Sequence, residues 1–364
     1  MFRKGVIHTM KIICSKSSLL KSVSIALKAV PSKTTMPILE CILMDATTNQ
    51  IKFTTNDMEL GIETIVEGTI EEKGKVALDA KIFYEIIRRL PDNDVTIKTD
   101  DKYAATITCE KAKFNIPGKS GEDFAYLPMI EKDEPLTISQ YTLKEMIRQT
   151  IFSIAVNENN KLMTGELFEI KNNCLKVVSL DGHRMVVPGK TLSEVSKILS
   201  GEVDDQVSIY FTKNHILFEF DQTMVVSRLI EGEYFRIDQM LSSDYETKLK
   251  INKKEFLDCI DRATLLVREV DKKPIIINIT DDDMELRIDS AMGSMNEEID
   301  IEKEGKDIMI GFNPKFLIDA LRVIDDETVT IYLVNPKAPC FIRDDEENYT
   351  YLILPVNINQ NQAR

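Results

Sequence analysis

The feature that most constrains this 364-residue chain is a pattern that occurs three times. Each copy has a short β-branched run, an amphipathic stretch, an acidic turn and a strand that ends in Ile. The copies read VALDAKIFYEIIRRLPDNDVTI at 76–97, VVPGKTLSEVSKILSGEVDDQVSI at 186–209 and IMIGFNPKFLIDALRVIDDETVTI at 308–331. Apolar residues recur at helical spacing in the middle of each copy, for example Ile82, Phe83, Ile86 and Ile87, which predicts a helix there. A repeat more than a hundred residues long exceeds a solenoid unit and indicates three tandem copies of one domain.

A second helix is predicted upstream of each copy, at 18–30, 142–152 and 253–264. Each of these helices follows a short strand, and alternating apolar and polar residues then predict antiparallel strands joined by short polar turns. The unit therefore has two halves of the βαβ type. We expect an α+β fold with three domains, at 10–128, 136–244 and 245–364, preceded by a leader or vector remnant at 1–9.

The middle copy is shorter than the other two. From the acidic residue after the third strand to the next copy of the pattern, the chain runs 19 residues at 57–76 and 19 at 289–308, but 5 at 181–186. About 14 residues, enough for a strand and a loop, are thus missing near 185–186. Either an edge strand has been lost or the numbering runs across an absent segment. The second interpretation is favoured because a strand lost from the middle of a sheet would leave its neighbour's hydrogen bonds unpaired.

Composition and motifs argue against several classes of protein. Hydrophobic residues make up 43% and charged residues 29%, as in ordinary globular proteins, and no apolar run is long enough to span a bilayer. The six cysteines are too far apart for a zinc or redox pair, and no glycine-rich phosphate-binding motif occurs. The run 181–184 (DGHR) could be read as a catalytic cluster, but a turn with a capping Asp and a left-handed Gly is the favoured interpretation.

Charge is distributed unevenly along the chain. The net charge is −14, which disfavours nucleic-acid binding through overall charge. The six predicted helices, taken as 18–30, 79–90, 142–152, 191–199, 253–264 and 314–323, nevertheless carry thirteen Lys and Arg against eight Asp and Glu. One such helix alone would be an ordinary solvated surface, but six helices of one repeated unit indicate a shared cationic surface.

Six short motifs resemble one protein family. They are NDMELGI (56–62), SLDGHRM (179–185), VVPGKTL (186–192), SRLIEGEYF (227–235), GFNPKFLIDAL (311–321) and YLILPV (351–356). In this order and in register with the repeat, they are similar to the bacterial sliding clamp, the β subunit of the DNA polymerase III holoenzyme. The resemblance covers the chain from Met10 onward.

The resemblance implies a dimeric ring in which strands form the outer skin and helices line the pore. Such a ring encloses double-stranded DNA without reading its sequence and tethers the replicative polymerase, which gives processivity in DNA replication. It implies a non-enzymatic, cytoplasmic protein with no cofactor, no metal and no membrane partner. The clamp-loader ATPase and repair proteins would bind through a short peptide of the Gln-Leu-x-Leu-Phe type. The alternative is a three-repeat protein-binding scaffold that never contacts DNA.

The family motifs and the helix polarity together suggest three sets of site residues. The partner-peptide pocket would comprise Met163, Leu180, Gly182, His183, Arg184, Phe235, Met240, Asn313, Phe316, Leu352, Ile353, Leu354, Pro355 and Val356. DNA contacts would come from Lys21, Lys28, Lys33, Arg88, Arg89, Arg148, Lys161, Lys197 and Arg322. The dimer interface would comprise Phe114 and Ile116 of one protomer and Leu265 and Leu266 of the other. Phe235 and Leu180 depart from the proline and the small polar residue usual in the family.

Overall fold

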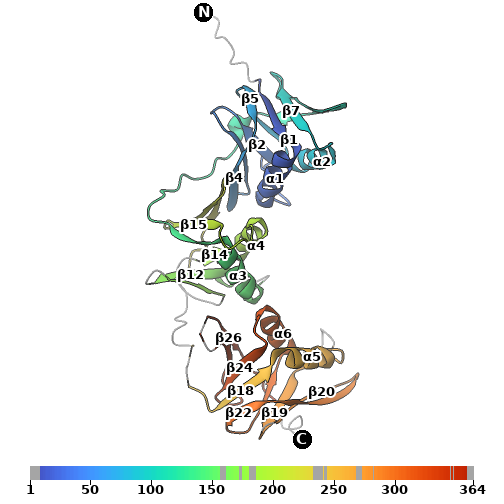
Figure 1. The fold of residues 1–364 in the computed structure, drawn as a ribbon, viewed down its shortest axis with the longest axis vertical. Coiled ribbons are helices and arrows are strands. Elements are labelled where there is room, and N and C mark those ends of the chain that lie inside the picture. The colour runs from blue at the N-terminus through green and yellow to red at the C-terminus, as the bar shows by residue number, and fades with distance from the viewer. Residues whose placement is uncertain are drawn as a thin grey trace, which may run out of the picture. The chain divides into compact units, whose positions relative to one another are not determined.

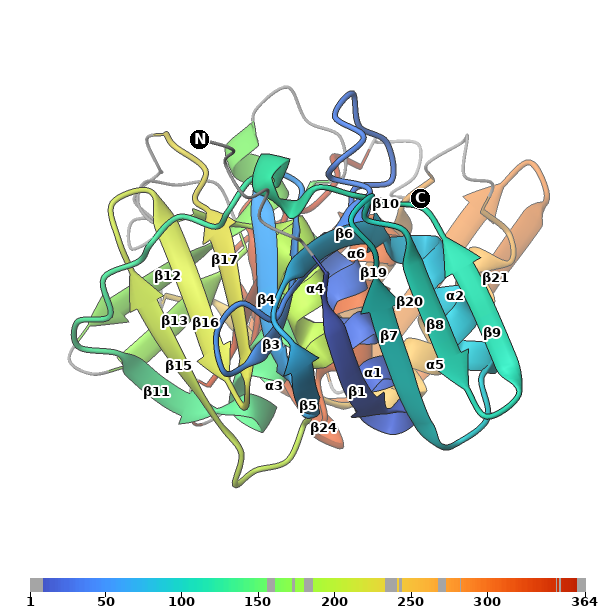
Figure 2. The ribbon, with the colours of Figure 1, turned by 90° about the horizontal axis from the view of Figure 1, so that it is seen from above.

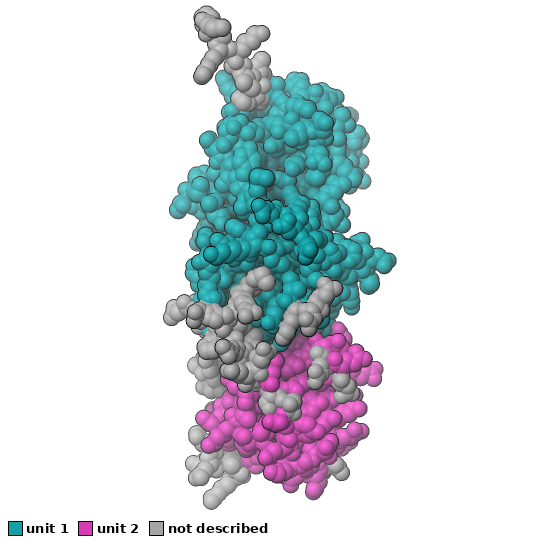
Figure 3. Space-filling model, turned by 90° about the vertical axis from the view of Figure 1, so that its left-hand side faces the viewer, with its two compact units in different colours: residues 1–235 teal, residues 236–364 magenta. Residues whose placement is uncertain are grey.

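The computed structural model describes residues 9–155, 161–171, 174–179, 186–232, 241, 244–267, 273–281, 283–344, 346 and 348–358. The chain divides into two compact units, residues 1–235 and 236–364 (Figure 3). In both units antiparallel strands form sheets and the helices pack together in pairs, α1 with α2, α3 with α4 and α5 with α6 (Figure 1).

The first domain contributes two helices, α1 (Lys16–Ala26), which continues into a 3-10 turn at Leu27–Ala29, and α2 (Ala80–Arg89). Both begin at a residue whose side chain caps the helix. The Ser15 hydroxyl accepts a bond from the Ser18 amide at 3.1 Å, and Asp79 accepts one from the Ile82 amide at 2.8 Å. Such caps satisfy an amide that has no partner within the first helical turn.

Two sheets in unit 1 carry the strands of the first domain. One has the order β5-β1-β7-β8-β9, and the other runs β10-β6-β2-β3-β4-β17-β16-β15-β11 into the second domain. In Figure 2 the strands β1, β7, β8 and β9 lie in front of α1 and α2. The strands are β1 (Lys11–Ser15), β2 (Cys41–Asp45), β3 (Ile51–Asn56), β4 (Leu60–Val66), β5 (Thr69–Glu72), β6 (Lys75–Asp79), β7 (Asp94–Thr99), β8 (Ala105–Cys109), β9 (Ala112–Ile116) and β10 (Gly118–Lys119).

The nine-stranded sheet is continuous because β4 pairs with β17 (Thr223–Arg228) of the second domain. The hydroxyls of Thr64 and Thr223 lie 2.9 Å apart across this junction, and Lys190 forms an ion pair with Asp57. Side chains of Ala29, Leu60 and Ile62 are part of the second domain's core. A shared sheet and a shared core therefore join the two domains into one unit.

The second domain contains α3 (Gln140–Thr150), a 3-10 turn (Ile151–Ser153) and α4 (Gly189–Ile198). A short 3-10 turn, Lys161–Thr164, precedes its first long strand. Its other strands are β11 (Leu136–Ser139), β12 (Gly165–Lys171), β13 (Cys174–Val178), β14 (Val186–Pro188), β15 (Gln206–Phe211) and β16 (His215–Phe220). Phe168 of β12 meets Phe218 of β16 edge to face, with ring centres 6.5 Å apart, at the centre of this core.

Among the described residues, the second domain lacks two strands that its neighbours have. Its smaller sheet has the order β13-β12-β14, whereas the corresponding sheet of unit 2 runs β21-β20-β19-β23. The counterparts of β21 and of the short strand β22 are missing, in agreement with the shorter spacing at 181–186. The place of β21 is at the end of its sheet, and β13 is the last strand of the smaller sheet among the described residues. Residues 180–185, next to which the absent segment was expected, lie outside the described residues.

Unit 2 repeats the two halves with α5 (Lys253–Thr264) and α6 (Pro314–Val323). Asn252 and Asn313 cap these helices, and proline begins α6, where its missing N–H has no cost. One sheet has the order β22-β18-β24-β25-β26 and the other β21-β20-β19-β23. The strands are β18 (Thr247–Asn252), β19 (Ile275–Thr280), β20 (Asp283–Ser290), β21 (Gly293–Asp300), β22 (Glu302–Gly305), β23 (Ile308–Phe312), β24 (Thr328–Leu333), β25 (Cys340–Arg343) and β26 (Thr350–Ile353). The α+β class and the six predicted helices are confirmed in the described part of the chain.

Candidate nucleic-acid interface and partner sites

The cations predicted to contact DNA all lie in the described part of the chain, on helices or next to them. Lys21, Arg88, Arg89, Lys197 and Arg322 are exposed on α1, α2, α4 and α6, whereas Arg148 of α3 is half-buried. Lys28 is half-buried in the 3-10 turn after α1. Exposed Lys33 lies in the loop after α1, and exposed Lys161 begins the 3-10 turn before β12.

Several of these bases are held by acids on the same helix. Glu85 binds Arg88 at 2.8 Å and Arg89 at 2.7 Å, Glu145 binds Arg148 at 2.6 Å, and Glu194 binds Lys197 at 2.7 Å. The hydrogen bond from Arg88 holds the pKa of Glu85 below its ordinary value. These pairs were not anticipated from the sequence, although the spacing of three residues between acid and base is visible there.

The edge strand β9 lies beside an open groove on unit 1. Phe114 of β9 is 38% exposed and Ile82 of α2 is 51% exposed, although Ile82 belongs to the apolar spacing from which the helix was predicted. The groove between them has a volume of about 380 Å³, and it is lined by Lys81, Ile82, Glu85, Ile86, Arg89 and Phe114. One large apolar side chain on an edge strand and one on the helix across the groove mark a surface that another chain can cover.

A complementary apolar feature lies on unit 2, after α5. Leu265 is 75% exposed and Leu266 is half-buried. Leu266 lies close to the edge strand β21, since a Cβ atom placed on Gly293 would be 3.7 Å from its Cδ2 atom. Phe114 and Ile116 thus lie on the edge strand β9 of unit 1, and Leu266 lies beside the edge strand β21 of unit 2.

The predicted peptide pocket is described only in part. Leu180, Gly182, His183, Arg184, Phe235 and Met240 lie outside the described residues. Met163 of unit 1 is half-buried in the 3-10 turn before β12.

In unit 2, the predicted pocket residues lie on α6 and on the chain around β26, which contact each other. Phe316 is exposed in the first turn of α6, which Asn313 caps. Leu354 is 62% exposed, whereas Ile353 is buried in the core and Leu352 and Pro355 are half-buried. The amide of exposed Val356 donates to the Gly311 carbonyl at 2.8 Å, which fixes the last segment against β23. Phe316 and Leu354 therefore offer exposed apolar surface on unit 2.

A buried acid in the second domain was missed by sequence reasoning. The Glu166 side chain is 0% exposed in β12, and neither carboxyl oxygen has a hydrogen-bond partner among the described residues. By strand alternation it points to the same side as Phe168, into the core. Burial raises the pKa of Glu166 to about 8, and the nearby Thr150 hydroxyl offsets only part of this effect.

The described residues contain no cluster of three or more His, Cys, Asp or Glu that could hold a metal ion. No helix among them is both long and apolar enough to cross a membrane. Repeated α+β domains, bases on helix surfaces and apolar side chains at free sheet edges, all within the described part of the chain, are the features expected of a DNA clamp.

Comparison with known proteins gives the family. The chain matches three domains described as DNA polymerase III beta subunit: the N-terminal domain at 10–128, the central domain at 137–235 and the C-terminal domain at 238–357. The beta sliding clamp of Staphylococcus aureus is 32% identical over 357 residues, covering 91% of this chain and 94% of the relative.

Solved structures agree with this result. A putative DNA polymerase III beta subunit from Eubacterium rectale is 69% identical with a TM-score of 0.93, covering 96% of this chain and 100% of that one. The DNA polymerase sliding clamp of Bacillus subtilis is 31% identical with a TM-score of 0.92 and the same coverage. The chain belongs to the DNA polymerase III beta subunit family, the sliding clamps. It is therefore a non-catalytic processivity factor of DNA replication.

Proposed function

We propose that two copies of this chain close head to tail into a ring around duplex DNA and tether a polymerase there. The observation that carries the proposal is the junction inside unit 1, where β4 of one domain pairs with β17 of the next. The repeat places equivalent strands at the two free edges, β21 in unit 2 and β9 in unit 1. Pairing of β21 with β9 of a second copy would reproduce the same junction between protomers.

The strand register supports this equivalence residue by residue. Phe114 of β9 pairs with Ile107 as Val225 of β17 pairs with Phe218. Likewise, Met295 of β21 pairs with Ile288 as Ile62 of β4 pairs with Thr55. Ile62 and Val225 face each other across the internal junction. The interface between protomers should therefore set Phe114 opposite the partner's Met295.

Side-chain volumes support the same arrangement. Ala29 lies fourteen residues after the cap of α1 and belongs to the same buried core as Leu192 and Val195 of the second domain. Leu266 lies fourteen residues after the cap of α5, so it holds the place of Ala29. A leucine needs more room than an alanine, and the open groove beside Phe114, of about 380 Å³, has that room.

A double substitution, Leu265→Ala with Leu266→Lys, tests the ring. We expect a folded monomer at micromolar concentration in sedimentation, because a lysine at the seam would bury an unpaired charge. Met129→Lys, at a fully exposed methionine of unit 1, is the matched control and should stay dimeric. A double variant that remains dimeric would refute the proposed seam.

Enclosure of DNA is tested separately from dimer formation, by retention of the protein on circular and on linear DNA. The exposed bases of the helices would meet phosphates, and such contacts carry no sequence information. A closed ring should be retained on circular DNA and lost from linear DNA, and the loss should be independent of sequence. Equal retention on both forms would favour simple surface binding. A protein with this function works in the cytoplasm, where the chromosome is replicated.

A partner tether would use the predicted peptide pocket. Exposed Phe316 and Leu354 offer apolar surface of the kind that accepts the leucine and the aromatic residue of a Gln-Leu-x-Leu-Phe peptide. Met163, Leu180 and Leu354 would surround the aromatic anchor, and Arg184 would add a polar contact. The replicative polymerase, the clamp-loader ATPase and repair proteins would share this site. A micromolar peptide contact is sufficient, because a ring that cannot leave DNA holds its partner at high effective concentration.

The test of the pocket is Leu354→Asp, measured by peptide titration and by DNA retention. We expect loss of peptide binding with unchanged DNA retention. Normal peptide binding by this variant would refute the pocket assignment.

A further inference from the structure

Four of the six helices in the described part of the chain share a charge pattern counted from the N-cap. An acid stands six positions after the cap and a base nine positions after it. The pairs are Glu85 and Arg88 in α2, Glu145 and Arg148 in α3, Glu194 and Lys197 in α4, and Asp319 and Arg322 in α6. The pattern recurs in the second helix of every domain and in the first helix of the middle domain, so it belongs to the repeated half of the domain rather than to one helix.

In the structure, these acids and bases form ion pairs. In α2, α3 and α4 the acid and the base of the same helix lie 2.8, 2.6 and 2.7 Å apart. In α6 the partners are exchanged: Asp319 binds Lys315 at 2.8 Å, and Arg322 reaches Asp261 of α5 at 3.3 Å. Each of the four bases therefore has a carboxylate within ion-pair distance.

These pairs are poorly suited to holding the fold together. They lie on helix surfaces in contact with solvent, where an ion pair contributes little to stability and is screened by salt. Their effect on the binding of a DNA phosphate by the same base is larger. A base that already binds a carboxylate must release it to bind DNA, so the net gain from that contact and the number of counterions released both fall.

We propose that the acid six positions after the cap is an internal counterion, which weakens the contact of the neighbouring base with DNA so that the ring slides instead of sticking. This inference rests on the proposed function, because it requires these helix surfaces to face DNA. The pattern assigns the role to Glu85, Glu145, Glu194 and Asp319.

Other bases lack such a partner. Helix α1 contains no acidic residue, and Lys21, Lys28, Lys33 and Lys161 form no ion pair with any described residue. These lysines would supply the net attraction for DNA, and the counterion pairs would limit it. The balance would favour weak contacts that exchange from one phosphate to the next.

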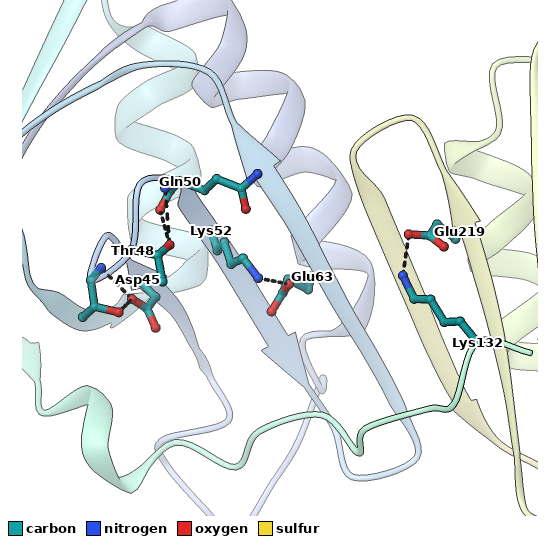
Figure 4. Close-up of polar contacts among 8 residues, drawn as sticks. Asp45, Thr48, Gln50, Lys52, Glu63, Lys132 and Glu219 are labelled. Carbon is teal, nitrogen blue, oxygen red and sulfur yellow. Dashed lines mark hydrogen bonds and ion pairs between the residues drawn. The ribbon is translucent and has the colours of Figure 1, made fainter.

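Ion pairs whose acids lie on strands provide a matched control. On the face of the nine-stranded sheet opposite its helices, Lys52 binds Glu63 at 2.8 Å and Lys132 binds Glu219 at 2.6 Å (Figure 4). A third strand pair joins Lys11 of β1 to Glu71 of β5 at 2.5 Å. Replacing three of these acids changes the net charge by the same amount as replacing three helix acids, but on strands instead of on the helix surface.

The experiment compares two triple variants of the full chain. The first carries Glu85→Gln, Glu145→Gln and Glu194→Gln, and the control carries Glu63→Gln, Glu71→Gln and Glu219→Gln. Binding to a fluorescent duplex is measured by anisotropy from 50 to 200 mM salt, on samples whose helix content is checked by circular dichroism. Each helix acid is also replaced singly, so that a triple variant that fails to fold does not end the test.

The helix triple should bind DNA more tightly than the control, with a log–log salt slope steeper by about 0.9 for each released base that reaches a phosphate. Each such contact corresponds to about a threefold greater loss of affinity over the fourfold rise in salt. The single variants should shift affinity in the same direction. Equal affinities and slopes for the two triples would overturn the inference, because net charge would then explain the whole effect.

A further variant separates this inference from the proposed function. Lys21→Gln with Lys28→Gln removes two bases that have no internal counterion. If this variant flattens the salt slope while the helix triple behaves like the control, the counterion inference fails and the DNA-facing surface stands. If neither set changes the slope, the helices do not face DNA, and the proposed function fails with the inference.

Discussion

Replacing Glu166 by glutamine should stabilise the protein at neutral pH and leave it unchanged at acidic pH. The carboxyl is fully buried and unpartnered among the described residues, and its pKa is raised from 4.5 to about 8 by desolvation. Glutamine has nearly the same shape and no charge, so the substitution removes the ionisation without opening a cavity.

The sign follows from proton binding. Between pH 4.5 and 8 the folded protein holds the Glu166 proton and the unfolded chain releases it, so the free energy of unfolding falls as pH rises. At about 1.4 kcal/mol for each unit of pKa difference, the loss reaches roughly 3 kcal/mol at pH 7 and about 5 kcal/mol above pH 8. The original chain has its full stability below pH 4.5 and has lost this contribution above pH 8, so the advantage of the variant grows over the same range.

Urea unfolding at pH 5, 6, 7 and 8 measures the difference between the Glu166→Gln variant and the original chain. The difference should be small at pH 5 and should grow in favour of the variant up to pH 8. Glu63→Gln, at a half-exposed carboxyl paired with Lys52, is the control and should show no growing difference. A Glu166→Gln variant less stable than the original chain at pH 8 would refute the reasoning, because it would mean that the carboxylate is ionised and paired in the fold.

Three further outcomes follow from the same structure. Gly61→Val should displace Leu127, whose Cδ2 atom lies 1.9 Å from the position of an added Cβ, and limited proteolysis should then cut the chain between 125 and 135 faster than in the original protein. Phe53→Ala should cost about 3–5 kcal/mol of unfolding free energy in urea titrations, because the fully buried ring packs edge to face on Phe83. Ser15→Ala should cost about 1 kcal/mol, measured in the same way, through loss of the cap of α1.

Most of the helices and the domain count could be predicted from local sequence. Apolar spacing and the repeat place α5 and α6 at the residues observed, Lys253–Thr264 and Pro314–Val323. These signals are local because a helix satisfies its own backbone hydrogen bonds within four residues. The repeat indicated three copies of one domain. The family motifs then indicated the clamp fold and its function.

The candidate sites were less accessible to sequence reasoning. Ile82 and Phe83 are neighbours in one apolar pattern, yet Ile82 is exposed beside a groove and Phe83 is buried. A hydrophobic pattern marks a side chain that will be covered, but whether the cover is the same chain or another one depends on which edges the fold leaves open. Glu166 gives no signal, because a single acid in a strand pattern normally faces water.

By itself the sequence determined the repeated α+β unit, the positions of the helices, their excess of positive charge and the shorter middle domain. All of these depend on residues close together in the chain. Only the tertiary structure decided that β4 pairs with β17 and that the Glu166 carboxyl is buried on the same side of its strand as Phe168. It also decided that acids on the helices form ion pairs with bases that were predicted to contact DNA. Strand partners, burial and ion pairs depend on groups brought together across the fold, and their free energies are set by the surroundings rather than by the residue type.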